Sequence, residues 1–512
     1  MFVDNIIPWH WQVIAGVAIL GYPCICALYN LYFHPLSKVP GPALWSAFRI
    51  RYVWSQLSGN IIRDCNDLHK KYGHVVRVAP DQVSISRRDV WSDAFQKQGE
   101  AQYPKDPRWW DPLPGLAAVG IFGTADPDKH ARIRKLISPA FGPRALASQE
   151  PILQQYSSLL VSRLRALVAS NCGQKWGKPV DVVEWLNFTT FDIFGDLAFA
   201  ESFECLSNSQ YHAWVAVLFN HAKAVVYGAL PNYYPWFAYV FKKMMPASMK
   251  QLLREQNQFI ADRLDRRFKA LDRPDAMSHI IKQMEAGNPG ISDDELCITV
   301  MELVTAGSET TATLLSGTVN YLVSNPEKLR ILTAEIRSRF KEEKEITLDA
   351  LRNDAPYLNA VLNEGLRMAP PVPCLPPRKV PAGGRTVCGT YLPQDAIFDV
   401  QIYLMNRDPE YWHSPESFRP ERWLPEASTN PKSPHFNDQR QACQPFSVGG
   451  KSCFGQHLAW AEIRLILAKL LWAFDIEAAA GKEKVAWEEL KVYMFYDKKP
   501  VWVRLKVRND SG

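Results

Sequence analysis

The segment Phe446-Ser-Val-Gly-Gly-Lys-Ser-Cys-Phe-Gly455 decides the fold of this chain, because it places a cysteine where a helix is expected to begin. The helix follows at once, from Gln456 onward, with apolar residues at helical spacing. Unpaired backbone N–H groups and the positive end of the helix dipole both favour a thiolate at Cys453. A thiolate is the form that binds iron, and the glycines of the segment let the backbone pass close to a flat cofactor, with Phe446 shielding the sulfur from water.

Two other interpretations of Cys453 stay open on this segment alone. The first is a buried structural cysteine, since a free cysteine commonly behaves as a small hydrophobic residue. The second is a zinc site formed by Cys443, Cys453 and His457. Zinc sites use compact pairs of ligands, and this set lacks a second convincing pair.

Composition limits the class of protein. The 512 residues are 47% hydrophobic and 22% charged, which excludes disordered, collagenous and coiled-coil chains. A formal net charge of +6 with no arginine-rich arm does not predict a nucleic-acid partner. The ten cysteines have no framework spacing, which predicts reduced thiols rather than disulfides.

Periodicity predicts one large, mainly α-helical domain with minor β-sheets over residues 43–512. Short strands are expected in Val75–Ser86, around a Pro80-Asp81 turn, and near 386–400. Helices are predicted at 127–140, 149–170, 182–200, 209–226, 247–272, 293–323, 326–341, 356–368 and 454–474.

The N-terminal end is unusual because the 33 residues between Asp4 and Lys38 contain no Asp, Glu, Lys or Arg. Trp9–Leu28 supplies the roughly 20 apolar residues that a helix needs to cross a bilayer. We therefore expect residues 1–33 to form a single-pass membrane anchor, residues 34–42 a proline-rich hinge, and the rest a cytosolic domain, since the positive charges follow the anchor. The alternative is a buried core helix.

The longest predicted helix begins at a capping box, Ser292-Asp-Asp-Glu295, and continues to about Val323. Its middle reads Ala306-Gly-Ser-Glu-Thr-Thr311. A glycine inside a helix costs about 1 kcal/mol relative to alanine. Gly307 therefore either permits close packing of a neighbouring helix or serves a function.

Two further segments carry paired charges. Glu364-Gly-Leu-Arg367 places an acid and a base three residues apart, which alone would be a weak surface pair. Phe418-Arg-Pro-Glu-Arg422-Trp follows later in the chain.

Taken together, these segments resemble the cytochrome P450 family, whose haem loop is FxxGxRxCxG. Phe446, Gly449, Cys453 and Gly455 match that loop, and Lys451 stands where the family usually has arginine. Lysine keeps the positive charge for a haem propionate but gives up a planar two-point contact. The resemblance implies a P450 fold in which Cys453 is the axial thiolate ligand of the iron of haem b.

The resemblance also implies roles for residues outside this loop. Next to the haem, Ala306 and Gly307 would leave room for dioxygen, while Glu309 and Thr310 would relay protons. Three charged residues, Glu364, Arg367 and Arg422, would form a buried structural triad that supports the cysteine loop. Residues expected beside the haem propionates are Arg134, His130, which replaces a frequent tryptophan, and Arg378.

The finer resemblance is to fungal microsomal P450s of secondary metabolism. It rests on Leu31–Pro42, on His130-Ala-Arg and on Phe194-Gly-Asp-Leu-Ala-Phe199. It implies a monooxygenase in the endoplasmic reticulum membrane that hydroxylates, epoxidises or desaturates a hydrophobic intermediate such as a terpenoid or polyketide. Electrons would come from NADPH through NADPH-cytochrome P450 reductase, with cytochrome b5 as an optional second donor.

Family position also implies which apolar side chains line the substrate pocket. They are Trp109, Trp110, Phe122, Val304, Val372, Leu375 and Phe495. The alternative for most of them is an ordinary core position.

Two other functions stay open at this point. One is a haem-thiolate isomerase or dehydratase that needs no reductase. Loss of the adjacent acid and alcohol on the long helix would indicate such an enzyme, but both residues, Glu309 and Thr310, are present. The other is a membrane protein that binds a hydrophobic ligand or haem without catalysis, and it predicts no NADPH-dependent turnover.

Overall fold

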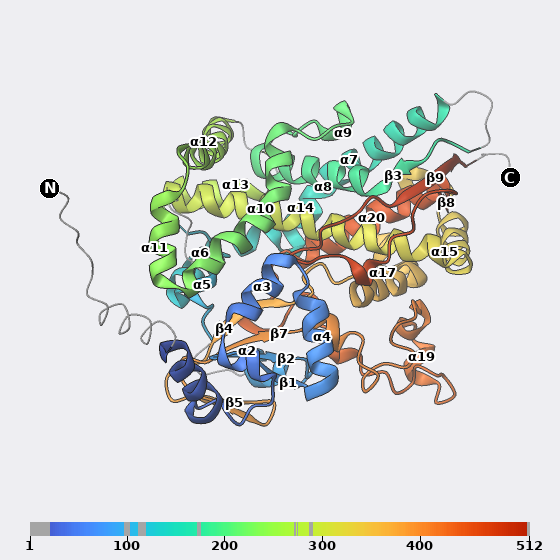
Figure 1. Cartoon of the computed structure of the whole chain (residues 1–512). Helices are drawn as coiled ribbons and strands as arrows, with labels where there is room; N and C mark the ends of the chain where they lie inside the picture. Colours follow the sequence, from blue (N-terminus) through green and yellow to red (C-terminus); the bar gives the residue numbers. More distant parts are fainter. Residues whose placement is uncertain are drawn as a thin grey trace.

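One long helix, α14 (Asp293–Ser324), runs through the middle of the molecule in the computed structural model (Figure 1). The structure describes residues 21–96, 103–110, 119–170, 176–270, 273, 275–285 and 290–508. The predicted capping box of α14 is confirmed, because the Ser292 hydroxyl accepts from the Glu295 N–H and the Glu295 carboxylate accepts from the Ser292 N–H. These contacts satisfy backbone donors at the start of the helix.

Other helices pack along α14 and bury it. The main ones are α8 (Val182–Phe199), α17 (Pro356–Met368) and α20 (Gln456–Ala473). In α8 every residue except Glu184 is buried, so this helix is apolar around its whole circumference, as expected for an interior helix.

The remaining α-helices surround this centre. They are α2 (Ala43–Ala47), α3 (Ile50–Ser58), α4 (Ile61–Tyr72), α5 (Pro107–Trp110), α6 (Pro127–Ile137), α7 (Pro143–Ala169), α9 (Cys205–Asn208), α10 (Ala213–Ala229), α11 (Pro235–Met244), α12 (Ala247–Lys269), α13 (Ala276–Glu285), α15 (Pro326–Arg339), α16 (Leu348–Asp354), α18 (Ile402–Met405) and α19 (Glu426–Thr429).

A four-stranded sheet lies to one side of the helices, beside α2, α3 and α4 (Figure 1). Its strand order is β1 (Val75–Ala79), β2 (Gln82–Ile85), β7 (Ile397–Val400) and β4 (Leu375–Lys379), with only β2 and β7 parallel. The predicted hairpin around Pro80-Asp81 is the β1–β2 pair and is confirmed.

Two smaller sheets complete the β-structure that the described residues form. One has the order β3 (Val180–Asp181), β9 (Trp502–Val507) and β8 (Phe474–Ala478), and the other pairs β5 (Arg385–Val387) with β6 (Thr390–Leu392). The strand region predicted near 386–400 therefore contains three strands.

Most of the predicted helices are confirmed to within four residues at each end. The largest difference is α7, which begins at Pro143 instead of 149 and continues through Pro151. Helices α3, α4, α11, α13 and α16, the short helices α2, α5, α9, α18 and α19, and strands β3 and β4 were not predicted. Strand β4 contains Pro376 and Pro377, which argue against a strand, yet it lies at the sheet edge, where proline is tolerated.

Most of the predicted membrane anchor, residues 1–20, lies outside the described residues. Residues 21–33 are helical, ending in a π-helix over Tyr29–Phe33, and residues 34–42 form turns without helix or strand. In the part of the chain that the structure describes, no helix combines the length and the apolar character needed to span a bilayer.

Candidate functional site

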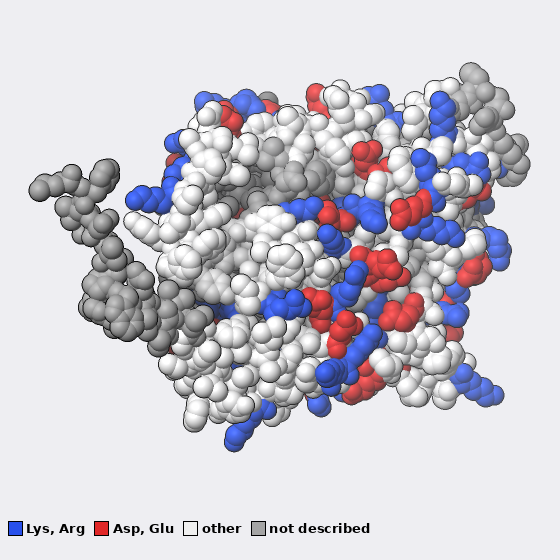
Figure 2. All heavy atoms as spheres, in the orientation of Figure 1, with Lys and Arg blue, Asp and Glu red and all other residues white. Residues whose placement is uncertain are grey.

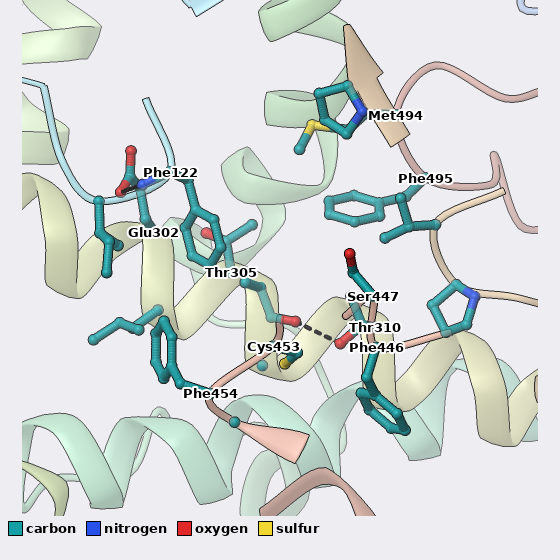
Figure 3. Close-up of a pocket in the computed structure, with 18 of the residues that line it drawn as sticks. Phe122, Glu302, Thr305, Thr310, Phe446, Ser447, Cys453, Phe454, Met494 and Phe495 are labelled. Carbon is teal, nitrogen blue, oxygen red and sulfur yellow. Dashed lines mark hydrogen bonds between the residues drawn. The ribbon is translucent and has the colours of Figure 1, made fainter. Parts of the chain in front are cut away.

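A cavity of about 420 Å³ lies between α14 and the segment that carries Cys453 (Figure 3). Its walls are mainly apolar. Of the predicted pocket residues it is lined by Trp109, Trp110, Phe122, Val372, Leu375 and Phe495. Val304 is different: it is fully buried in the core, so its assignment to the pocket is wrong.

The Cys453 segment is fixed by hydrogen bonds at its ends. The Cys453 N–H donates to the Phe446 carbonyl at 2.8 Å, and Arg134 Nη1 donates to the Ser452 carbonyl at 2.7 Å. Helix α20 begins at Gln456, with Gly455 as its N-cap, so the cysteine precedes the helix as predicted. The thiol opens onto the cavity, which excludes an inert core cysteine.

Opposing effects act on the pKa of the Cys453 thiol. Burial raises the pKa of the thiol, while the Gly455 N–H and the positive charge of Arg134 oppose that rise. The backbone N–H at the helix start thus favours the thiolate as expected, but burial disfavours the charged form more strongly. A cation bound to the sulfur would supply the missing stabilisation.

Cationic side chains gather along one wall of the cavity. The predicted residues Arg134, His130, Arg378 and Lys451 all line it, and Lys105, which sequence reasoning missed, joins them. Arg378 is 8% exposed, and its Nε and Nη1 are buried without a hydrogen-bond partner. Such orphaned donors are costly and call for an anionic partner.

Burial and the neighbouring positive charges both lower the pKa values of these groups. Burial, followed by the charge of Arg378, lowers the pKa of Lys451 to about 8 and that of Lys105 to about 7. Burial, with the charge of Lys105 as the next cause, lowers the pKa of His130 to about 4. An anion with carboxylate groups would oppose these shifts.

The thiol, the apolar cavity, the neighbouring cations and the unpartnered donors of Arg378 fit haem. Cys453 would bind the iron, and Arg134, Arg378 and Lys451, with His130 nearby, would face its propionates. The aromatic ring of Phe446 lines the same cavity beside the cysteine segment and lies 6.1 Å from the Trp460 ring, centroid to centroid.

The zinc alternative is wrong. Within the described ranges, no three His, Cys, Asp or Glu side chains come together as metal ligands. Cys443 packs in a separate cluster with Tyr411, Trp412 and Ala442, away from the cavity.

On α14, Ala306, Gly307 and Thr310 line the cavity as predicted. The Thr310 hydroxyl donates to the Ala306 carbonyl at 2.6 Å, the dashed contact in Figure 3. A Cβ atom at Gly307 would lie 1.8 Å from Cζ of Phe194 on α8, so the close-packing interpretation of this glycine is confirmed. Its expected role beside the haem stays a prediction.

Glu309 does not share the cavity wall with Thr310. Its Oε1 accepts from Lys498 Nζ at 2.6 Å, and Lys498 also donates to Thr313 Oγ1 at 3.1 Å and Asn187 Oδ1 at 3.2 Å. The two members of the acid-alcohol pair thus have different surroundings, with the acid held behind the helix by a buried ion pair.

The predicted structural triad is brought together completely. Arg367 donates to Glu364 through Nε at 2.9 Å and Nη2 at 2.8 Å, and Arg422 Nε donates to Glu364 Oε1 at 3.1 Å. All three side chains are 0% exposed, so the weak surface pair is excluded. The Arg422 carbonyl accepts from Arg440 Nε at 2.7 Å, which connects the triad to the chain leading into the cysteine segment.

Two acidic residues in the cavity wall were also missed by sequence reasoning. Glu302 lies on α14, and Glu462 lies on α20, where burial raises its pKa to about 8. Glu462 could have been predicted, because it is an acidic residue on the apolar face of a predicted helix. Nothing in the local sequence pattern indicates Lys105.

Comparison with known proteins agrees with this geometry. Residues 35–501 match the family model described as Cytochrome P450. The chain is 37% identical to cytochrome P450 monooxygenase efuB of Hormonema carpetanum, with 97% of each chain covered. It is 37% identical to averantin hydroxylase of Dothistroma septosporum, covering 97% of this chain and 91% of the relative, and 36% identical to trichothecene C-4 hydroxylase of Trichoderma arundinaceum, covering 97% of each.

The family match spans nearly the whole chain and includes every element that builds the cavity. Haem with a cysteine thiolate ligand, and electrons from a redox partner, come with that family. The chain belongs to the cytochrome P450 family, as an enzyme of its monooxygenase type.

Proposed function

We propose that this enzyme oxidises a hydrophobic secondary-metabolite intermediate, such as a terpenoid or polyketide, with O2 and electrons from NADPH delivered by NADPH-cytochrome P450 reductase. The observation that carries the proposal is the apolar cavity that separates Cys453 from Thr310. A cavity of this kind selects apolar ligands by burying their surface. Two of the relatives are named as hydroxylases, which favours hydroxylation over epoxidation or desaturation.

When bound, haem supplies the oxidising chemistry. The chain's own residues orient the substrate and exclude water. Trp109, Phe122 and Phe495 approach the cavity from three separate parts of the chain, so that an apolar ligand is enclosed from several sides. Figure 3 shows the rings of Phe122 and Phe495 on opposite sides of the space above Thr310.

We propose that the Thr310 hydroxyl accepts and passes on protons at the cavity wall. Its hydrogen is engaged by the Ala306 carbonyl, which leaves oxygen lone pairs able to accept from a water molecule or substrate. Glu309 faces another side of α14, so we propose that it takes part in this proton transfer through intervening water, with its unpartnered Oε2 as the acceptor.

Replacing Thr310 with alanine is expected to divert electrons from product to hydrogen peroxide. Product formed per NADPH should fall by at least about tenfold, less than the roughly 100-fold that a positioned proton donor typically supplies, because water can fill the vacated space. Peroxide and product are measured together against NADPH consumed. Thr310→Ser keeps the hydroxyl and should keep most of the coupling; equal coupling in Thr310→Ala and the wild type would reject the role.

We also propose that the enzyme is held at the endoplasmic reticulum membrane by its N-terminal end, with the catalytic domain in the cytosol. An exposed apolar surface supports this: Trp236, Tyr239 and Met244 of α11 are 71%, 67% and 76% exposed, and Trp54 of α3 is 63% exposed. Figure 2 shows few charged atoms over α11 and α3, while charges gather on the other half of the same face. Such a patch is typical of membrane contact.

The direct test of the proposed function is incubation of microsomes that contain this enzyme and reductase with NADPH and an extract of the producing organism. The expected result is an NADPH-dependent mass gain of one oxygen in a hydrophobic metabolite. Turnover without NADPH and reductase would indicate the isomerase or dehydratase alternative, and no turnover with any apolar fraction would indicate a non-catalytic binder. An alkaline wash of the same microsomes, after which the protein stays in the pellet, tests the membrane attachment separately.

A further inference from the structure

Glu302 places a carboxyl group in a cavity wall that is otherwise mainly apolar. It precedes Ala306 by four residues and Thr310 by eight, so the three lie on one face of α14. All three line the cavity. The carboxyl therefore occupies the same substrate space as Thr310, two helical turns away from it.

The carboxyl is held by the backbone of a neighbouring loop. Oε2 accepts from the Phe122 N–H at 2.8 Å and Oε1 accepts from the Gly123 N–H at 3.1 Å; Figure 3 shows the group beside the Phe122 backbone. A Cβ atom at Gly120 would lie 2.3 Å from Oε2, so the loop needs a glycine there to admit the carboxyl. The geometry is that of a site built around this group.

Lys105 binds the backbone carbonyl groups of the same loop. Its Nζ donates to the Ile121 carbonyl at 3.1 Å and also to the Phe122 carbonyl. Residues 121–123 are thus fixed through their N–H groups by an acid and through their carbonyl groups by a base. This double contact keeps Glu302 in one position, as a specificity-determining residue requires.

The carboxyl retains capacity to bind a ligand. A carboxylate can accept about four hydrogen bonds, and the two backbone N–H groups use two of them. The side chain is only partly buried by the protein, and it opens onto the cavity. A ligand donor that reached it would satisfy acceptor sites that are otherwise poorly solvated.

Nearby charges determine which kind of donor fits. Lys105 lies against the same loop, and Arg378 and Lys451 line the same cavity. These cations disfavour a positively charged ligand. Burial raises the pKa of Glu302 to about 7, and in either protonation state the group can accept from a neutral hydroxyl.

We propose that Glu302 is a specificity-determining residue that accepts a hydrogen bond from a neutral hydroxyl group on an otherwise apolar substrate. The inference rests on the proposed function. It places the enzyme after a reaction that installs a hydroxyl, either an earlier oxygenation or the reduction of a carbonyl. The substrate is then an alcohol with an apolar skeleton, rather than a hydrocarbon or an amine.

The test uses a series of 1-substituted imidazoles with alkyl chains of increasing length that end in a methyl, a hydroxyl or an ammonium group. The holoenzyme is titrated with each, and the Soret shift caused by the imidazole nitrogen gives the dissociation constant. At the chain length that reaches Glu302, the hydroxyl-ended compound should bind about tenfold more tightly than the methyl-ended one, as expected for a hydrogen bond to a charged group.

In Glu302→Leu this preference should vanish or reverse. Met301→Leu, which changes a neighbouring cavity residue without removing a polar group, should keep it. Should Glu302→Leu fail to hold haem because the loop is released, Glu302→Gln serves instead, and it should reduce the preference at least about threefold because a neutral acceptor is weaker.

Three results would overturn the proposal: no chain length at which the hydroxyl is preferred, a preference that survives in the Glu302 variants, or tightest binding by the ammonium series. A thermal midpoint that falls in Glu302→Gln with an unchanged preference would assign Glu302 to holding the loop alone and would also overturn it. If no imidazole of any chain length shifts the Soret band of the wild-type holoenzyme, the cavity does not admit apolar ligands to the haem. That result contradicts the proposed function rather than this inference.

Discussion

Cys453→Ala is expected to abolish both the red-shifted Soret band of the reduced, carbon monoxide-bound protein and all NADPH-dependent product formation. Among the described residues that line the cavity, Cys453 carries the sole thiol. The thiolate is what shifts the band and favours O–O cleavage, so no other side chain in the cavity can replace it. His130 also lines the cavity, but an imidazole bound to iron would give an unshifted band.

The control for this experiment is Cys443→Ala. Cys443 lies outside the cavity, partly buried, and desolvation raises the pKa of its thiol to about 12, which favours the neutral form. This variant should keep the shifted band and the activity of the wild type. A shifted band that persisted in Cys453→Ala, or that disappeared in Cys443→Ala, would show that the ligand has been assigned to the wrong cysteine.

The second large effect is expected for Glu364→Gln. The substitution keeps the size of the side chain but removes the charge that faces Arg367 and Arg422, both 0% exposed. Arg422 keeps its ion pair with the buried Asp438, but Arg367 loses the carboxylate with which it pairs. An uncompensated buried charge costs about 3–5 kcal/mol, against a total stability of about 5–15 kcal/mol for a typical domain. The variant should therefore unfold at a much lower urea concentration and be recovered mostly without haem.

Glu342→Gln provides a matched control on the surface. Glu342 pairs with Lys344, and the two side chains are 61% and 79% exposed. Exposed pairs contribute roughly 0–1 kcal/mol, so this variant should unfold close to the wild type. Urea unfolding followed by tryptophan fluorescence, together with the haem content of the purified protein, compares the three proteins. If the Glu364→Gln midpoint equals that of Glu342→Gln, the triad is not what stabilises the cysteine segment.

The long helices could be predicted from sequence because their signals are local. The capping box at Ser292 and the apolar periodicity after it are readable within a few turns, and α14 begins and ends within one residue of its predicted bounds. Strand β4 could not be predicted, because its two prolines are acceptable only at a sheet edge. That position depends on the place of β4 beside β7 in the sheet, and the local sequence does not reveal it.

Local sequence signals likewise predicted part of the site, and contacts between distant segments determine the rest. The residues around Cys453 and in the triad form recognisable segments, and the structure brings them together as expected. Glu302 was missed because its partners are backbone N–H groups 180 and 179 residues away, which leave no side-chain pattern in the sequence. The orientation of Glu309 was equally unreadable, since it is set by Lys498, 189 residues further along.

The contact between Gly307 and Phe194 has a consequence for how such enzymes can diverge. Any side chain at 307 would meet the ring of Phe194, whereas a smaller residue at 194 would release that space. A larger residue at 307 on α14 therefore requires an earlier change to a smaller residue at 194 on α8, whereas 194 can change alone. A change in the shape of the cavity wall at 307 thus depends on a prior substitution of Phe194. By itself, that prior substitution only removes packing contacts.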